Sequence, residues 1–338
     1  MTAKIFMKIP MLLLLVLLTT GSVSVIFLSS AALTKGDVLD TGETDSGIVL
    51  GVDEENIEAG FPVSETVSML PQSNPYTGPM PPVRINPSED IQISSSKGIA
   101  IDSESGEILF AKNADERTPI ASISKLITAL VFLDNNPGWE TVYQIGPRDR
   151  REGGKIYLYN GDRVYVRDLF NLSLTASDNS ATIALVNSTG LSEIEFVNKM
   201  NEKAKEIGLL DTSFLEPVGL SRYNVSTARE VAGILKAALE KEEISKALLA
   251  PKYEFYTLDN IHKIAFNTDI LLGQLDDGMA IEGGKTGYTE SAGYCFASKI
   301  TNKDENPIIS VVLDDVSHYA RFNEVEKIAE WAYGNYIW

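Results

Sequence analysis

The chain of 338 residues contains one cysteine and two histidines, and this scarcity excludes several kinds of site. A single cysteine excludes an internal disulfide, and Cys295 lies in an apolar, strand-like run where a small buried hydrophobe is expected rather than a reactive thiol. Cysteines and histidines also do not cluster at metal-ligand spacing. We therefore expect no metal site and assign no cofactor.

Positive charge is scarce as well. Lysine and arginine number 29 against 47 aspartates and glutamates, which gives a formal net charge of -18. Because phosphate contacts need clustered lysine and arginine, this balance excludes nucleic acid as a partner. The composition, 44% hydrophobic and 22% charged, is that of a globular chain with one large domain or two small ones.

Charge is absent altogether from residues 9–34, which follow Lys4 and Lys8. About 20 apolar residues suffice to cross a bilayer as a helix. With lysines on the short side of the run, the positive-inside rule places the bulk of the chain outside the cytoplasm. We predict that residues 1–34 are a signal peptide or an N-terminal transmembrane anchor, and the small residues of "SSAAL" are compatible with cleavage. The expected location is extracytoplasmic, in the periplasm or at the cell surface, tethered to the cytoplasmic membrane.

Residues 35–90 are acidic and rich in glycine, proline, serine and threonine. Such a segment buries too little apolar surface to offset its ordering entropy. We therefore predict a flexible linker over 35–90 and a catalytic domain over 91–338.

Patterns in the domain predict paired strands at "KGIAIDSESGEILFAKN", around a turn at "SESG". Apolar spacing of three and four residues then predicts a helical block, followed by three strands and a last helix. The helices are expected at 122–133, within 166–187, at 192–207, 227–240 and 318–336, and the strands at 279–287, 292–300 and 307–315. This order predicts an α+β fold, with one sheet assembled from both ends of the chain and a helical insert.

"ASISKLITAL" places Ser122 and Lys125 three residues apart at the start of a predicted helix, so both side chains share one face. A lysine can take the proton of a serine hydroxyl if desolvation or nearby positive charge lowers its pKa by several units from about 10.4. The first-turn N–H groups would also favour developing negative charge. An N-cap serine beside a snorkelling lysine explains this pair alone equally well.

A second pair with the same spacing, Ser94 and Lys97, lies in a strand-like segment. Residues three apart in a strand point to opposite faces, so we interpret this pair as a solvated domain edge.

"LTASDNSAT" places Ser177 and Asn179 in a polar break between apolar helical stretches. A break of this kind suits a hydroxyl and an amide that point into a cleft, although a simple helix-linking turn accounts for it as well.

"IEGGKTGYTESAGY" ends a strand-like run flanked by glycines. Gly283, Gly284 and Gly287 permit a ligand backbone to approach the strand edge, as in recognition by strand addition. A carboxylate could then be held by Lys285, Thr286 and Thr289.

The motifs S-x-x-K, S-x-N and K-T-G occur in this order in penicillin-binding proteins and β-lactamases. With them, and with "ADERTPIASISKL", "VGLSRYNVSTAREVA" and "FNTDILL", the chain resembles the serine-type D-alanyl-D-alanine carboxypeptidases over residues 98–338. These are low-molecular-mass penicillin-binding proteins of the penicillin-binding/β-lactamase-like superfamily. The resemblance implies a β-lactamase/transpeptidase-like fold, in which the active site lies between an antiparallel sheet and a helical subdomain.

The resemblance also implies roles for individual residues. Ser122 attacks the carbonyl between two terminal D-alanines and becomes an acyl ester, with Lys125 as its base. Ser177 relays the proton to the leaving amine, and Asn179 orients Lys125 or the substrate.

On the strand, Lys285 assists the relay and biases the site toward anions, while Thr286 and Thr289 bind the terminal carboxylate. The backbone N–H groups of Ser122 and Tyr288, beside Gly287, form the oxyanion hole. The implied partners are peptidoglycan stem peptides ending in D-Ala-D-Ala, and β-lactam antibiotics as inhibitors.

Two positions depart from the family pattern: Ser180 stands where an aspartate is usual, and Glu216 where an asparagine is usual. Glu216 keeps open a class A-like β-lactamase, in which a glutamate activates the deacylating water. A non-catalytic peptidoglycan-binding module is the other alternative, although it would need neither base nor nucleophile. A Ser-His-Asp hydrolase is disfavoured because His262 and His318 have no G-x-S-x-G nucleophile elbow to serve.

Overall fold

The computed structural model describes residues 78–87, 90–276 and 278–338. The chain divides into two units, Met1–Gln72 and Ser73–Trp338, and the described residues belong to the second. The predicted membrane segment and most of the predicted linker lie outside the described residues, so both remain predictions. Within the described ranges, no helix is long and apolar enough to cross a bilayer.

One antiparallel sheet of five strands organises the domain, in the order β10-β11-β12-β2-β3. Strands β2 (Lys97–Asp102) and β3 (Ile108–Lys112) come from the first part of the domain. Strands β10 (Ala280–Thr289), β11 (Gly293–Thr301) and β12 (Pro307–Asp315) come from the last. The predicted sheet from both chain ends is therefore confirmed, and β10, which carries the K-T-G motif, is its edge strand.

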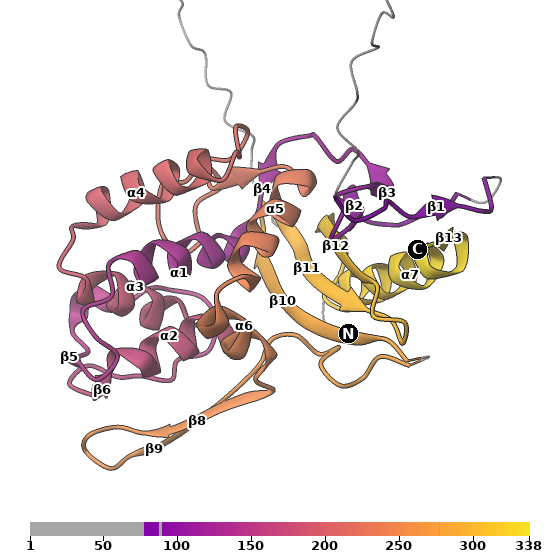
Figure 1. The fold of residues 1–338 in the computed structure, drawn as a ribbon. Helices are drawn as coiled ribbons and strands as arrows, with labels where there is room; N and C mark the ends of the chain where they lie inside the picture. Colours follow the sequence, from indigo (N-terminus) through magenta and orange to yellow (C-terminus); the bar gives the residue numbers. More distant parts are fainter. Residues whose placement is uncertain (1–77, 88–89, 277) are drawn as a thin grey trace, which may run out of the picture. The chain divides into compact units, whose positions relative to one another are not determined.

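Helices cover both faces of this sheet (Figure 1). On β12, Ile309 and Val311 pack in one apolar cluster with α5 (Ala228–Leu239). Their neighbours Ile308 and Val312 pack in the other cluster, with α7 (Ala320–Asn335). Two buried faces explain why "PIISVVLDD" is an almost unbroken apolar run instead of an alternating one.

The predicted helical subdomain lies beside the sheet (Figure 1). It contains a 3-10 turn η1 (Ala121–Ile123) and α1 (Ser124–Asp134), α2 (Val166–Thr175), α3 (Asn179–Ser188), α4 (Glu193–Glu206) and α6 (Glu242–Leu249). A capping box from Ser192 and Glu195 fixes the start of α4, where the predicted helix also begins. Helix α6 was not predicted, because its eight residues follow α5 after a short turn and show too few apolar repeats.

Several two-stranded pairs complete the domain. These are β1 (Val83–Arg84) with β13 (Tyr336–Ile337), β4 (Thr118–Pro119) with β7 (Val225–Ser226), β5 (Val142–Gln144) with β6 (Arg163–Tyr165), and β8 (Lys252–Tyr256) with β9 (His262–Phe266). A 3-10 turn, η2 (Pro147–Asp149), precedes β6. Strand β1 lies inside the range predicted as linker, so paired structure begins before Ile91.

Helix α1 is the central helix of the core. Every residue from Ser124 to Phe132 is buried, including the apolar "LITAL" stretch. Packing on all sides gives the first turn of α1 little freedom to move. This turn carries Lys125, and Ser122 lies in η1 directly before it.

Candidate active site

The nucleophile turn holds Ser122 in the middle of η1, directly before α1. Ala121 adopts a left-handed backbone with φ +47°, a conformation that costs a non-glycine residue about 1–3 kcal/mol and persists only when its surroundings enforce it. The enforcing neighbour is Gly219, where a Cβ would lie 1.9 Å from the Ala121 carbonyl oxygen. Close packing on Gly219 therefore fixes the turn that presents Ser122.

Lys125 is fully buried behind Ser122. Its Nζ donates to Ser122 Oγ at 2.8 Å, to Asn179 Oδ1 at 2.9 Å and to the Val218 carbonyl at 2.8 Å. Burial lowers its pKa from 10.5 to about 7, against the opposing charges of Glu216 and Asp178. Near neutral pH a substantial fraction of Lys125 is therefore neutral and able to accept the Ser122 proton.

Glu216 uses both carboxylate oxygens to hold one turn. They accept the backbone N–H groups of Val218 at 2.7 Å, Gly219 at 2.6 Å and Ser221 at 3.2 Å. This turn provides the carbonyl that accepts from Lys125 and the glycine that packs on Ala121. The arrangement favours a structural role for Glu216 over activation of a hydrolytic water.

Replacing Glu216 by glutamine is expected to shift the acid limb of kcat/KM to lower pH. The Glu216 charge favours the ammonium form of Lys125, so its removal lowers the Lys125 pKa and leaves more neutral base at acid pH. The measurement is kcat/KM for D-alanine release as a function of pH. An acid limb that stays in place or moves to higher pH would contradict this assignment.

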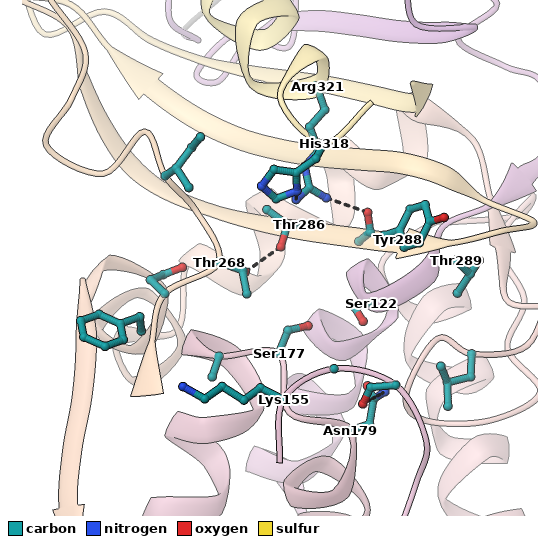
Figure 2. Close-up of a pocket in the computed structure, with 18 of the residues that line it drawn as sticks. Ser122, Lys155, Ser177, Asn179, Thr268, Thr286, Tyr288, Thr289, His318 and Arg321 are labelled. Carbon is teal, nitrogen blue, oxygen red and sulfur yellow. Dashed lines mark hydrogen bonds between the residues drawn. The ribbon is translucent and has the colours of Figure 1, made fainter. Parts of the chain in front are cut away.

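Ser177 lies in the break between α2 and α3, as predicted, whereas Asn179, also predicted in the break, begins α3. Ser177 has a left-handed backbone, φ +57°, and lines the cavity beside Ser122 (Figure 2). Asn179 is the first residue of α3 and binds Lys125 through Oδ1, while its Nδ2 donates to the carbonyl of Glu152 at 2.8 Å. Of the two predicted functions of Asn179, the orientation of Lys125 is thus present in the structure.

Ser180, the other departure from the family pattern, secures the loop opposite Ser122. Its Oγ accepts the Arg151 N–H at 3.0 Å. Together with Asn179, which bonds to Glu152 and Gly153, it anchors the loop that forms one wall of the cavity.

Lys285 lies on β10 but does not line the cavity. It is 1% exposed, and its Nζ donates to the Thr286 carbonyl at 3.1 Å. Burial, reinforced by the charges of Lys125 and Arg321, lowers the pKa of Lys285 well below its ordinary value. Both predicted functions of Lys285, the relay and the attraction of anions, stay predictions.

The three glycines of β10 do not share one function. A Cβ at Gly287 would lie 2.9 Å from the Ile120 carbonyl oxygen and 3.1 Å from the Ser122 nitrogen, so only glycine lets β10 contact the nucleophile turn. Gly283 instead faces Leu239, and Gly284 faces Asp269 and Phe296. The expectation that all three give a ligand access to the strand is therefore wrong for Gly283 and Gly284, which make room for the protein's own side chains.

Thr286 and Thr289 both line the cavity, and each makes its own hydrogen bond. Thr286 donates from Oγ1 to Thr268 Oγ1 at 2.6 Å, whereas Thr289 Oγ1 accepts the Ala292 N–H at 3.1 Å in the turn after β10. That both hold the terminal carboxylate stays a prediction. Tyr288, between them, is half exposed and stacks on Tyr294 at 4.2 Å.

Arg321, in the first turn of α7, lines the cavity and was not predicted. Its Nη1 donates to the Gly287 carbonyl at 2.9 Å, and its Nη2 donates to His318 Nδ1 at 3.1 Å. Burial lowers its pKa to about 10, so it stays cationic at neutral pH. In the sequence, Arg321 directly precedes Phe322, the first apolar core residue of α7. A charged side chain next to a core position is the signal by which Arg321 could have been found.

These side chains surround one open cavity of about 700 Å³ (Figure 2). Ser122 is at its centre, between β10 and the break that carries Ser177 and Asn179. The predicted position of the active site, between the sheet and the helical subdomain, is the position of this cavity. Ser122 has a buried amine base beside it and faces the backbone of an edge strand. This arrangement suits nucleophilic attack by the hydroxyl on a peptide carbonyl.

The other candidate residues lie in different settings. Ser94 precedes β2 and donates to Glu324 at 2.6 Å, while Lys97 lies 3.9 Å from Asp314, so this pair does not cooperate. His262 contacts Glu254 on the β8–β9 hairpin. Cys295 is buried, and burial raises its pKa to about 12, as expected for an inert thiol.

Comparison with known proteins adds to this geometry. The family profile described as D-alanyl-D-alanine carboxypeptidase matches residues 84–317. A D-alanyl-D-alanine endopeptidase of Pseudomonas aeruginosa is 30% identical over 243 residues, which are 71% of this chain and 77% of the relative. The D-alanyl-D-alanine carboxypeptidase DacF of Bacillus subtilis is 31% identical over 250 residues, 72% of this chain and 63% of the relative.

Solved structures are similar over the same region. The Streptomyces K15 DD-transpeptidase superposes with a TM-score of 0.68 at 25% identity, over 73% of this chain and 99% of that one. Penicillin-binding protein D2 of Listeria monocytogenes, in its ampicillin-bound form, superposes with a TM-score of 0.62 at 30% identity. The match covers 72% of this chain and 99% of that one.

Proposed function

The chain belongs to the D-alanyl-D-alanine carboxypeptidase family of serine peptidases, and on this premise we propose that it removes the terminal D-alanine from peptidoglycan stem peptides outside the cytoplasm. One observation carries the proposal. The buried Lys125, with its pKa near neutrality, donates a hydrogen bond to Ser122 in a cavity whose opposite wall is the edge strand β10.

Acylation begins with neutral Lys125. It takes the Ser122 proton as Ser122 Oγ attacks the carbonyl carbon between the last two D-alanines. The negative charge that develops on the carbonyl oxygen is stabilised by the N–H groups of Ser122 and Tyr288, and one such donor is worth about 10²- to 10³-fold in rate. The close approach of Gly287 to the Ser122 nitrogen supports this pairing of donors.

Collapse of the intermediate breaks the peptide C–N bond. The leaving amine takes a proton through Ser177, with Lys285 assisting the relay, and free D-alanine departs. Water then attacks the Ser122 ester, and its proton returns to Ser122 as the shortened peptide is released. Burial and the charges of Lys125 and Arg321 lower the pKa of Lys285, and this direction supports its part in proton transfer.

We assign the terminal carboxylate of the substrate to Thr286 and Arg321. Thr286 lines the cavity, and Arg321 adds a buried positive charge fixed to the Gly287 carbonyl. In a chain with a net charge of -18, a local cation of this kind is what makes an anionic terminus favourable.

Replacing Arg321 by alanine is expected to remove most of the preference for a free carboxylate. A charge-assisted hydrogen bond contributes about 1.5–3 kcal/mol, so the ratio of kcat/KM for diacetyl-L-Lys-D-Ala-D-Ala over its C-terminal amide should fall by about 10- to 100-fold. Arg321→Lys, which keeps the charge, should retain part of the ratio. A ratio unaffected by Arg321→Ala would exclude Arg321 from carboxylate binding.

The experiment that tests the proposed function is D-alanine release from diacetyl-L-Lys-D-Ala-D-Ala, with penicillin release measured in parallel. A carboxypeptidase releases D-alanine and keeps penicillin as a long-lived ester. Penicillin release within seconds would instead favour the β-lactamase alternative, against which the hydrogen bonds of Glu216 already argue. Absence of D-alanine release from the folded protein would contradict the proposal.

We extend the proposal to location on the basis of the sequence. The uncharged residues 9–34 and the lysines before them support export, with the chain either tethered to the cytoplasmic membrane or cleaved after the segment. Fractionation of cells that express the full chain, followed by N-terminal sequencing, distinguishes tethering from cleavage. Recovery of the intact chain in the cytoplasm would contradict both.

A further inference from the structure

Part of the cavity wall has no role in the mechanism above. Beyond Ser177, the cavity is lined by Lys155, Tyr157 and Phe266, which touch neither the nucleophile nor its base in any described contact. D-Alanine carries only a methyl side chain, whereas the cavity measures about 700 Å³. The cavity therefore extends past the residues that the mechanism uses, to these three side chains.

The wall formed by Lys155, Tyr157 and Phe266 lies on the side of the cavity where we expect the leaving residue. Ser177 lies between Ser122 and Lys155 in Figure 2, and the leaving amine takes its proton on the Ser177 side. The wall also continues from the carboxylate site. Thr286 bonds to Thr268 at 2.6 Å, and Phe266 is two residues before Thr268, at most about 7 Å further along the chain. A side chain of a few carbon atoms spans this distance.

The chemistry of the wall is that of an anion site beside aromatic rings. Among the described residues, the Lys155 ammonium lies 5.1 Å from the centre of the Tyr157 ring and pairs with no carboxylate. Phe266 is 62% exposed and faces the same cavity. In a strongly acidic chain, a cation that faces a cavity without a carboxylate partner attracts an anionic ligand.

We infer that Lys155, Tyr157 and Phe266 form a subsite for the side chain of the leaving residue, and that this subsite selects side chains that bear a carboxylate. The inference rests on the proposed function and extends its substrate class to D-Ala-D-X peptides with an acidic X. The leaving residue keeps its main-chain carboxylate at Thr286 and Arg321. The bond that breaks, and the path of the proton, are those of D-alanine release.

The test compares two leaving residues of equal shape and different charge. Diacetyl-L-Lys-D-Ala-D-Glu and diacetyl-L-Lys-D-Ala-D-Gln are hydrolysed in parallel, and the ratio of their kcat/KM values is measured. For the native chain we expect a ratio of roughly three to ten in favour of D-Glu, the size of effect expected for a partly exposed ion pair. The ratio should fall as salt is added, because salt screens such a pair.

Three variants of Lys155 separate charge from structure. Lys155→Gln should bring the ratio to about one, Lys155→Arg should preserve it, and Lys155→Glu should invert it. Lys246→Gln, which removes an exposed lysine of α6 that pairs with Glu242, is the matched control and should keep the native ratio.

The outcomes distinguish this subsite from the proposed function. Suppose that the enzyme releases D-alanine from D-Ala-D-Ala. The subsite alone would then be overturned if the native enzyme showed a D-Glu to D-Gln ratio near one, or if Lys155→Gln kept the native ratio. Absence of hydrolysis of D-Ala-D-Ala itself would overturn the proposed function and this inference with it.

Discussion

Replacing Ser122 by alanine will abolish both D-alanine release and covalent reaction with penicillin. The rate loss is expected to be at least about 10⁴-fold, the scale seen when a serine peptidase loses its nucleophile. Ser122 is the hydroxyl that accepts from Lys125, and η1 presents it to the cavity in an enforced backbone conformation. The measurement is single-turnover D-alanine release together with the intact mass of the protein after incubation with penicillin.

The chain offers its own control for this experiment. Ser94 belongs to the second pair with the same spacing, and its hydroxyl bonds to Glu324 at the domain edge. Ser94→Ala should therefore react with penicillin at close to the native rate. A Ser122→Ala variant that still releases D-alanine within about tenfold of native would show that another residue is the nucleophile.

Replacing Lys125 is expected to be nearly as damaging. Loss of a general base costs about 10²- to 10⁴-fold. Lys125→Met removes the amine and keeps a side chain of similar length, and Lys125→Arg keeps hydrogen-bond donors but stays protonated at any accessible pH. Both variants should acylate Ser122 slowly, and the measurement is the rate constant for adduct formation with penicillin.

Comparison of Lys125→Met with Lys125→Arg distinguishes loss of the catalytic base from loss of the structural contacts of Lys125. Lys125 also holds the Asn179 side chain and the Val218 carbonyl, so thermal unfolding must be recorded for each variant. Lys97→Met, which changes the lysine of the second pair with the same spacing, is the matched control. A folded Lys125→Arg protein that acylates within tenfold of native would contradict the assignment of Lys125 as the base.

The local part of the site was predictable because spacing defines it. Ser122 and Lys125 are three residues apart at a helix start, and their hydrogen bond follows from that geometry. Their distant partners were found through the order of the three motifs, a pattern of sequence rather than of physics. The Val218 carbonyl has no side-chain signature, so nothing in the sequence could identify it as an acceptor for Lys125.

The cation of the carboxylate site was not predicted, for a physical reason. The lysine next to Thr286 in the sequence, Lys285, is buried and does not line the cavity. The cation beside Thr286 is instead Arg321, brought there because α7 packs against the sheet. A contact between chain segments this far apart depends on tertiary packing, which local patterns do not encode.

The fold was predictable where apolar patterns are long. The bounds of β12 were predicted without error, because a mostly apolar stretch that ends in two aspartates has one clear interpretation. Helix α6 and strand β1 were missed, since each is short and stabilised by its neighbours: α6 packs under β10, and β1 pairs with β13. Glu216 and Ser180, which depart from the family pattern, both serve to hold loops around the cavity.

The most direct test of the account is the site of covalent modification by penicillin, determined by peptide mapping of the native protein. We expect one penicillin per chain, on the peptide that contains Ser122. D-alanine release should be lost in proportion to the adduct, and the ester should be stable for many minutes. An adduct on a different residue, or a protein that releases D-alanine while Ser122 stays unmodified under saturating penicillin, would contradict it.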